Sequence, residues 1–266
     1  MGFSYDKWPL TDRPPASING LLSERFPPPR RREMKCEYLI FNLLVIAGPV
    51  AATVGRRAER VARWPAVLLS VVLAMIPYVI WDALVTNRHW SFSESYTLGV
   101  RVAGLPIEEW LFFVTVPSAS LFIWEGLSAR FEIKETARLQ TVRVLLGLGI
   151  PVGALVFATG KEYTGLALIA VGIVAVLDRL LAANLLLQAR TYLFLLIVCG
   201  LVLLFNGYLT ARPVVIYNAS YQLGVRVVTI PIEDFLYGLS LMFLNALVYE
   251  KIRNRMRVGR GLRGRP

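Results

Sequence analysis

Residues 98–111 read LGVRVAGLPIEEWL, and residues 223–236 read LGVRVVTIPIEDFL. Nine of these fourteen positions are identical at an offset of 125 residues. The same offset relates Tyr96 to Tyr221, Glu37-Tyr38 to Glu162-Tyr163 and Trp124-Glu125 to Tyr249-Glu250, and one residue of slippage relates Trp81-Asp82 to Phe205-Asn206. Chance does not produce matches at so many places, so the chain contains an internal repeat.

Apolar runs of transmembrane length flank both copies. The chain is 56% hydrophobic with a mean hydropathy of +0.55, which is too apolar for a water-soluble domain of 266 residues. A helix needs about 20 apolar residues to cross the hydrocarbon core. Seven runs approach that length, at residues 38–54, 64–81, 108–124, 142–159, 163–177, 191–208 and 232–249. The run 163–177 either ends at Asp178 or belongs to a longer helix that continues to Gln188.

The repeat groups these runs as three, one and three. Three crossings reverse the direction of the chain, so the run 142–159 is needed for the second triplet to enter with the orientation of the first. We expect an all-α, polytopic membrane helical bundle of about seven transmembrane helices in a 3+1+3 parallel internal repeat. The expected parts are a disordered or non-native extension over residues 1–33 with Met34 as the true start, a first repeat over 34–130, a connecting span over 131–160, a second repeat over 161–250 and a basic tail over 251–266.

The net charge of +11 indicates membrane topology rather than a nucleic-acid partner, because Lys and Arg gather in short loops and tails beside the apolar runs. The tail after residue 249 is the most basic of these segments, which predicts a cytoplasmic C-terminus in a multi-pass protein of the cell membrane. Both acidic stretches then lie at the outer face. Arg30, Arg31 and Arg32 conflict with this orientation if residues 1–33 are native.

Each copy of the repeat places two acidic residues directly after Pro-Ile, at the start of an apolar run. Proline and acidic residues are also ordinary signals for a helix N-terminus. Two copies favour function, because charge near membrane depth is costly. We expect Glu108, Glu109, Glu233 and Asp234 to converge as candidate acid and base catalysts. Crowding favours one protonated carboxyl group and the helix dipole opposes it, so the sequence assigns no roles.

Aromatic and polar residues near these acids are candidates for contact with a substrate, since ring faces stabilise cationic carbon. They are Trp81, Asp82, Tyr96, Trp110, Phe112, Phe113, Asn206, Tyr221, Phe235 and Tyr237. For Trp90, Phe92 and Tyr217 an interfacial aromatic belt is the favoured interpretation. Arg101 and Arg226 are either charge partners of the acids or loop arginines at the headgroup level.

Metal and cofactor chemistry has little material in this sequence. His89 is the sole histidine, in a polar loop that predicts a surface position, and the two cysteines build neither a disulfide framework nor a zinc site. Gly147-Leu148-Gly149 lacks the flanking strand and the glycine spacing of a dinucleotide fingerprint. We therefore predict no metal and no cofactor.

Trp81-Asp82, the two GVRV stretches, PIEEWLFF and PIEDFLYG together resemble the lycopene cyclase domain over about residues 34–250. That domain occurs as fused single chains, as two-subunit bacterial enzymes and in bifunctional fungal proteins. The resemblance implies an isomerase of carotenoid biosynthesis that cyclises the ψ-end groups of lycopene to β-rings, giving γ-carotene and then β-carotene. An acid would protonate the terminal alkene and a base would remove a ring proton, roles that carboxylates supply. The implied partners are membrane lipid, lycopene and other enzymes of carotenoid biosynthesis, without nucleic acid.

Other functions stay open at this point. A carotenoid ε-cyclase or an end-group hydratase would differ only in the fate of the cation, which the sequence does not decide. A small 3+1+3 transporter would need a polar route through the midplane, whereas the runs are nearly free of Asn, Gln and charge at mid-depth. A seven-helix photoreceptor would need a lysine inside the last run, and residues 232–249 contain none.

Overall fold

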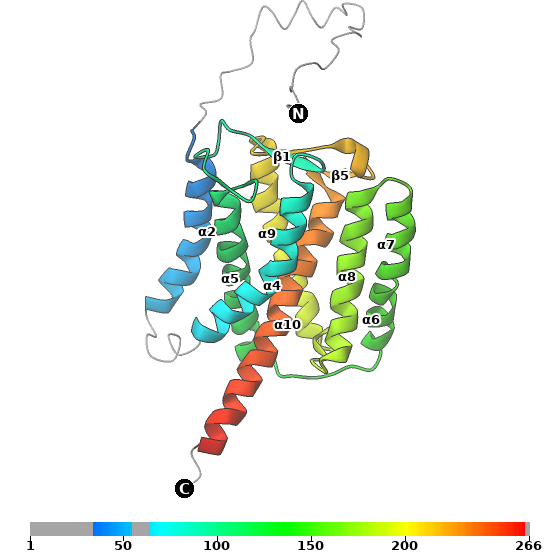
Figure 1. Cartoon of the computed structure of the whole chain (residues 1–266). Helices are drawn as coiled ribbons and strands as arrows, with labels where there is room; N and C mark the ends of the chain where they lie inside the picture. Colours follow the sequence, from blue (N-terminus) through cyan, green and yellow to red (C-terminus); the bar gives the residue numbers. More distant parts are fainter. Residues whose placement is uncertain (1–33, 55–63, 264–266) are drawn as a thin grey trace, which may run out of the picture. The chain divides into compact units, whose positions relative to one another are not determined.

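The computed structural model describes residues 34–54 and 64–263, all within the compact unit that begins at Met34. The predictions for residues 1–33 and for the basic loop that follows the first apolar run fall outside these residues. The described chain is a bundle of helices closed at one end by loops and short strands (Figure 1).

The helices follow the apolar runs in chain order. They are α2 (Glu37–Val54), α4 (Trp64–Val85), α5 (Ile107–Arg130), α6 (Leu139–Gly147), α7 (Gly149–Ala158), α8 (Glu162–Leu180), α9 (Ala189–Ala211) and α10 (Ile232–Arg263). Within the described residues, six stretches are long and apolar enough to cross a membrane, counting α6 and α7 together. Helix α2 contributes a shorter apolar helix over Glu37–Ala51. The prediction of a helical membrane bundle is confirmed.

The connecting span is broken at Leu148 and lies tightly against α8. A Cβ atom on Gly153 would lie 2.5 Å from the carbonyl oxygen of Gly165, so the two backbones approach as only glycine allows. Helix α8 ends at Leu180 rather than continuing to Gln188. The carboxylate of Asp178 stabilises this end, because it accepts the backbone N–H groups of the short 3₁₀ turn Leu185–Leu187 at 2.7 and 3.2 Å.

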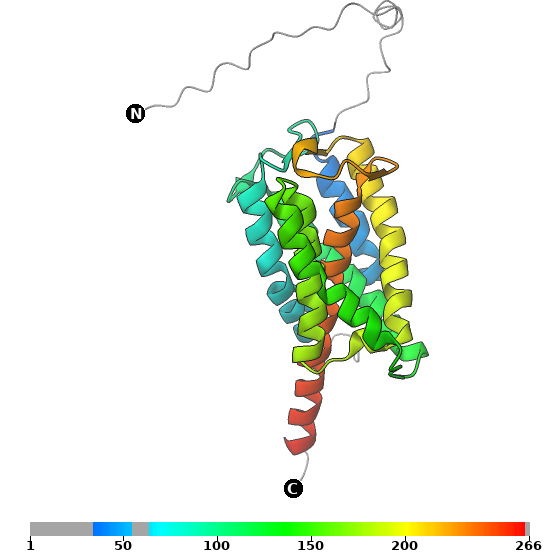
Figure 2. The ribbon, with the colours of Figure 1, turned by 90° about the vertical axis from the view of Figure 1, so that its right-hand side faces the viewer.

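The two repeats assemble around a common axis. Helices α2, α4 and α5 correspond to α8, α9 and α10, and α10 packs against α4, α8 and α9 in the middle of the bundle (Figure 2). Strand β1 (Trp90–Phe92) pairs antiparallel with β4 (Val215–Tyr217), and the central pair Ser91 and Ile216 are equivalent residues of the two repeats. A two-fold pseudo-axis therefore passes through this strand pair.

Two hairpins complete this end of the bundle. Strand β2 (Arg101–Val102) pairs with β3 (Leu105–Pro106) ahead of α5, and β5 (Arg226–Val227) pairs with β6 (Ile230–Pro231) ahead of α10. The 3₁₀ turn Ala219–Tyr221 lies between β4 and β5. We call residues 86–106 and 212–231 the roof, because they cover the helix ends where the repeated acidic residues lie.

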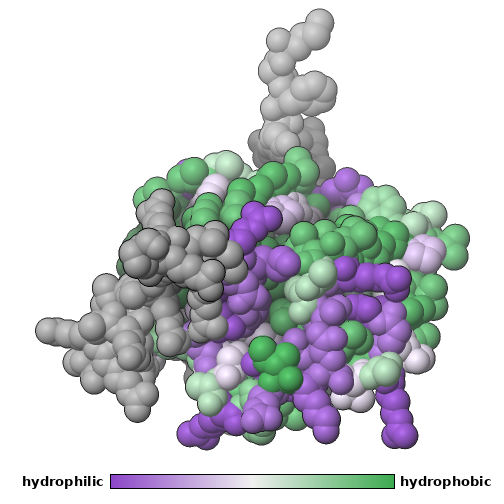
Figure 3. Space-filling view, turned by 90° about the horizontal axis from the view of Figure 1, so that it is seen from below, coloured by the Kyte–Doolittle hydropathy of each residue, from purple (hydrophilic) through white to green (hydrophobic). Residues whose placement is uncertain are grey.

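The opposite end is held by reciprocal bonds between the repeats. The Trp124 indole donates to Glu250 at 2.8 Å, and the equivalent Tyr249 hydroxyl donates to Glu125 at 2.6 Å. Arg253 forms ion pairs with both carboxylates, at 2.6 Å to Glu250 and 3.2 Å to Glu125. Figure 3 looks at this end of the molecule, where hydrophilic side chains gather among apolar ones. Each repeat thus satisfies the buried polar group of the other.

Candidate functional site

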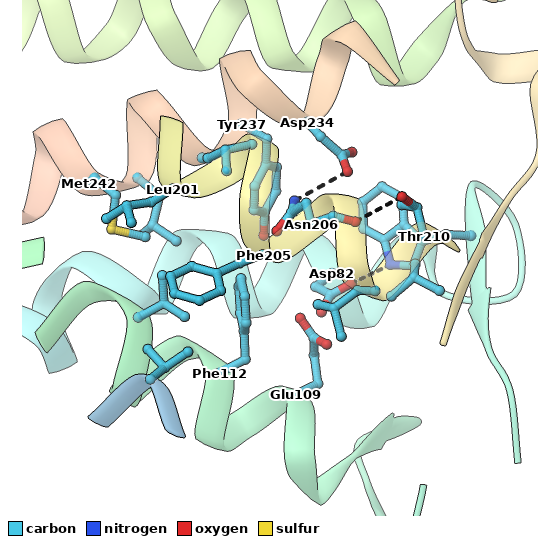
Figure 4. A pocket seen from close by; sticks show the side chains of 18 of the residues that line it. Asp82, Glu109, Phe112, Leu201, Phe205, Asn206, Thr210, Asp234, Tyr237 and Met242 are labelled. Atoms are coloured by element: carbon cyan, nitrogen blue, oxygen red, sulfur yellow. Dashed lines mark hydrogen bonds between the residues drawn. The ribbon is translucent and has the colours of Figure 1, made fainter. Parts of the chain in front are cut away.

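A cavity lies inside the bundle below the roof, and its polar end holds three carboxyl groups from three helices (Figure 4). They are Asp82 of α4, Glu109 of α5 and Asp234 of α10. Six more side chains with a ring or a polar group surround them: Tyr38, Trp90, Tyr163, Asn206, Tyr217 and Tyr237. Both repeats therefore build one chamber together.

The repeated acidic pair divides into two positions with different tasks. Pro106 and Pro231 directly precede α5 and α10, which places both acidic residues of each pair in the first turn of a helix. Successive residues of a helix point to different faces. Glu108 and Glu233 turn back to the roof, where they accept the backbone N–H groups of Leu98 at 2.6 Å and Leu223 at 2.8 Å.

Glu233 also accepts the Thr164 hydroxyl at 2.5 Å. Neither Glu108 nor Glu233 lines the cavity, whereas the following residues, Glu109 and Asp234, do. The first acid of each pair thus holds the roof, and the second faces the chamber.

Asp234 is surrounded by hydrogen-bond donors. The hydroxyl groups of Tyr163 and Tyr217 each donate to it at 2.5 Å, and the amide of Asn206 donates at 3.3 Å. Burial, followed by the charge of Asp234, raises the pKa of the Tyr217 phenol above its ordinary value of 10. Tyr217 is therefore a neutral donor at physiological pH, and this arrangement suits a carboxylate that carries its negative charge.

The other two carboxyl groups have fewer donors and interact with each other. Glu109 accepts the Tyr38 hydroxyl at 2.5 Å, and Asp82 accepts the Trp90 indole at 2.6 Å. Negative charges on both Asp82 and Glu109 would repel each other, because the two groups line the same cavity. Position 206 is the counterpart of position 82, so an amide stands beside Asp234 where a second acid stands beside Glu109. The chamber is chemically asymmetric although its frame is nearly symmetric.

Aromatic rings enclose the polar end. Trp81 lies 4.8 Å from Tyr237 between ring centroids, and Trp90 lies 4.9 Å from Tyr163. Phe112 and Phe205 line the cavity further from the roof, where it continues as an apolar limb along α5, α9 and α10. Aromatic rings around a small volume can stabilise a cation through their negative faces.

The structure brings several of the predicted residues to the cavity, namely Asp82, Glu109, Phe112, Asn206, Asp234 and Tyr237. Trp81 contacts Tyr163 and Tyr237 without appearing in the cavity lining. Phe113 and Phe235 are buried in the core away from the lining, and the Trp110 indole donates to the carbonyl oxygen of Val102.

Tyr96 and Tyr221 belong to the roof. The guanidinium of Arg212 lies 5.2 Å from the Tyr96 ring centroid, and Tyr221 lies 4.7 Å from the His89 ring. The substrate-binding roles of Tyr96 and Tyr221 stay predictions.

Arg101 and Arg226 were interpreted either as charge partners of the acids or as loop arginines, and the described contacts place both in the loop hairpins. Arg101 donates to the carbonyl oxygen of Gly104 at 3.0 Å, and Arg226 donates to that of Thr229 at 2.7 Å. Among the described residues, no ion pair joins either arginine to the acidic pairs. Each arginine instead bonds across the turn of its own hairpin, where its side chain is exposed.

The surface position predicted for His89 is wrong. Only 1% of the residue is exposed, and its Nε2 lies 2.9 Å from Glu162. Trp90, Phe92 and Tyr217 likewise line the cavity rather than form an interfacial belt. The reason is the same in each case: the roof folds over the helix ends and turns these side chains inward.

Sequence reasoning did not single out Tyr38 and Tyr163, which donate to Glu109 and Asp234 at equivalent places. The signal was present, because Glu37-Tyr38 and Glu162-Tyr163 match at the offset of the main repeat. In the described part of the chain, no group of three or more His, Cys, Asp or Glu side chains is arranged to hold a metal ion. The absence of a cofactor stays a prediction.

Fold and site define a polytopic helical membrane protein with carboxyl groups and aromatic rings around an apolar chamber. The family model described as lycopene cyclase matches residues 36–127 and again residues 160–252, so the chain belongs to the lycopene cyclase family. Of the described helices, the first matched segment covers α2, α4 and most of α5, and the second covers α8, α9 and most of α10. No curated protein and no solved structure matches the chain significantly. The family makes the protein a carotenoid cyclase of carotenoid biosynthesis.

Proposed function

We propose that the protein is a lycopene β-cyclase that closes each ψ-end group of lycopene to a β-ring without redox change, and thus acts as an isomerase. The observation that carries this proposal is the asymmetry of the chamber. Asp234 is held by three donors, while Asp82 and Glu109 lie together with fewer donors on the side of the first repeat.

Asp82 and Glu109 supply the acid. Two carboxyl groups in one water-poor chamber retain a proton between them, because full ionisation would bury two like charges. The proton passes to the terminal alkene of the ψ-end group and leaves a tertiary cation. The π electrons of a second double bond of the same end group attack this cationic carbon and form the ring C–C bond. The positive charge then lies on a ring carbon. Tyr237 and Trp90 line the space where this charge develops.

Asp234 supplies the base. Its negative charge stabilises the ring cation, and it accepts the proton from the ring carbon as the C–H electron pair becomes the new double bond. The proton gained equals the proton lost, so the product is an isomer of the substrate. No cofactor is required by this balance. The proton returns to the acid pair before the next cycle.

The apolar limb and the surrounding lipid suit a hydrocarbon substrate that resides in the bilayer. We place the C-terminus in the cytoplasm and the chamber toward the opposite face, on the strength of the basic tail. Other enzymes of carotenoid biosynthesis that share this membrane are the proposed neighbours.

The test is pigment analysis of a lycopene-accumulating bacterial host that expresses the chain or one of two variants. Asp234→Asn removes the base and should abolish ring formation, whereas Glu233→Gln keeps an oxygen acceptor outside the cavity and should retain ring formation at a reduced rate. Chromatography and mass separate β-rings from ε-rings and from hydrated ends. Products with ε-rings or added water would replace the β-cyclase assignment, and unchanged lycopene despite confirmed membrane expression would refute the proposal.

A further inference from the structure

The apolar limb of the cavity is too short for a whole carotenoid. It runs from Glu109 to Ser120 along α5, which is about 16 Å at 1.5 Å per residue. On α9 it ends near Val198, and on α10 near Met242. A linear carotenoid can span the hydrocarbon core of about 30 Å. With one end group at the carboxyl groups, roughly half of the molecule therefore has to lie outside the limb.

The remaining half has no straight path through the bundle. One turn beyond Ser120, Trp124 is fully buried and packs edge-on against Phe194 at 5.4 Å. Its indole is bonded to Glu250, and the guanidinium of Arg190 lies 4.9 Å from its ring centroid. We call Trp124, Phe194, Glu250 and Arg190 the floor. A hydrocarbon chain would have to break this buried polar cluster in order to pass.

Few contacts join α2 and α9 beside the limb. Helix α4 packs closely along α10, whereas their counterparts α9 and α5 touch at the floor and leave a gap above it, which the cavity fills. Helix α2 covers this gap, with Val45 as its contribution to the limb. Two lining residues on the neighbouring helices, Ala119 and Leu201, are only half-buried. The limb therefore reaches the lipid-facing side of the bundle here.

Contacts between α2 and α9 lie near the roof. Glu37 forms an ion pair with Arg212 at 2.6 Å and accepts the Tyr208 hydroxyl at 2.5 Å. Phe41 lies edge-on to Phe205 with ring centroids 5.6 Å apart. These contacts fix the two helices at the acid end and leave the lower part of their boundary, at Val45 and Leu201, to apolar side chains.

We infer that a linear carotenoid enters end-first from the lipid between α2 and α9, and that each ring is made in a separate visit to this chamber. The inference rests on the proposed function. Because the floor blocks passage, the far end reaches the carboxyl groups only after the monocyclic intermediate has left and entered again in the opposite sense. The monocyclic carotenoid is then a free component of the bilayer.

An isotope-dilution experiment tests the separate visits. The full-length wild-type protein is placed in lipid vesicles with excess unlabelled lycopene and a known amount of deuterated γ-carotene. If the intermediate leaves, early bicyclic product carries deuterium in proportion to the labelled fraction of monocyclic carotenoid. Accumulation of unlabelled monocyclic carotenoid made from lycopene would also show that the intermediate leaves after one ring. Bicyclic product that forms from lycopene without label would overturn the inference. Absence of any ring product from lycopene would instead count against the proposed function.

Paired substitutions test the place of access. Val45→Trp and Leu201→Trp fill the limb, and each has a matched control that faces lipid on the same helix, Leu44→Trp and Leu204→Trp, at 70% and 64% exposure. We expect at least a tenfold loss of lycopene turnover and of co-purified lycopene in the limb variants, and less than a twofold change in the controls. Full activity in both limb variants would overturn this route. If a limb variant fails to accumulate, the wild-type labelling experiment still decides whether the intermediate leaves.

Discussion

Adjacent carboxylates in the first turn of α5 should respond very differently to the same substitution. Glu109→Gln removes a group that lines the chamber, and loss of a general acid costs about 100-fold to 10,000-fold in rate. Glu108→Gln keeps an oxygen that can accept the N–H of Leu98, which now lies 2.6 Å from the carboxylate. Weakening this one hydrogen bond costs about 1 kcal/mol, or about fivefold in rate if the roof must be closed for each turnover.

The assay is lycopene turnover by purified protein in lipid vesicles, together with thermal unfolding of each variant in detergent. Glu108→Gln should lower the unfolding temperature by a few degrees and activity by about fivefold, while Glu109→Gln should leave the unfolding temperature closer to that of the wild type. Equal loss of activity in two folded variants would refute the division of tasks within the acidic pair. So would a Glu109→Gln variant with activity near that of the wild type.

Three more outcomes follow from the hydrogen bonds around the chamber. Tyr38→Phe removes the donor to Glu109 and should lower turnover about tenfold without loss of the folded protein, as measured by turnover and by size-exclusion chromatography. Tyr217→Phe leaves Asp234 with two donors and should cost about tenfold in turnover, whereas Phe92→Tyr, at the equivalent place, should not restore it. Burial lowers the pKa of His89 below its ordinary value of 6.5 despite the opposing effect of Glu162, so its contribution to stability is complete above about pH 6.5 and is lost as the pH falls toward the folded-state pKa. Unfolding temperatures between about pH 5 and pH 8 should show this loss in the wild type and less of it in His89→Gln.

The repeat made much of the fold predictable. Matches such as Pro106 with Pro231 fixed which runs correspond, and the length of the runs indicated membrane-crossing helices. The boundary of α8 was not predictable from hydropathy, because it depends on a bond from Asp178 to the backbone of the next turn.

The candidate site was predictable only in part. The pattern pointed to Glu109 and Asp234, but it gave equal weight to Glu108 and Glu233, since one position along a helix changes the face by about 100° and the sequence does not show which face is inside. A tryptophan at position 90 fits an interfacial belt as well as it fits a chamber wall. Its place was decided by the β1–β4 pairing, which joins residues far apart in the chain.

The strand pair at the pseudo-axis bears on how such a chamber can arise. Two identical chains related by a true two-fold axis would carry the same side chain at both equivalent positions, so an acid at one would force an acid at the other. In a single covalent chain the two equivalent positions can be substituted independently, and here Asp82 is equivalent to Asn206. Fusion of the halves therefore permits a proton donor and a proton acceptor to specialise on opposite sides of one substrate, which a symmetric homodimer cannot do.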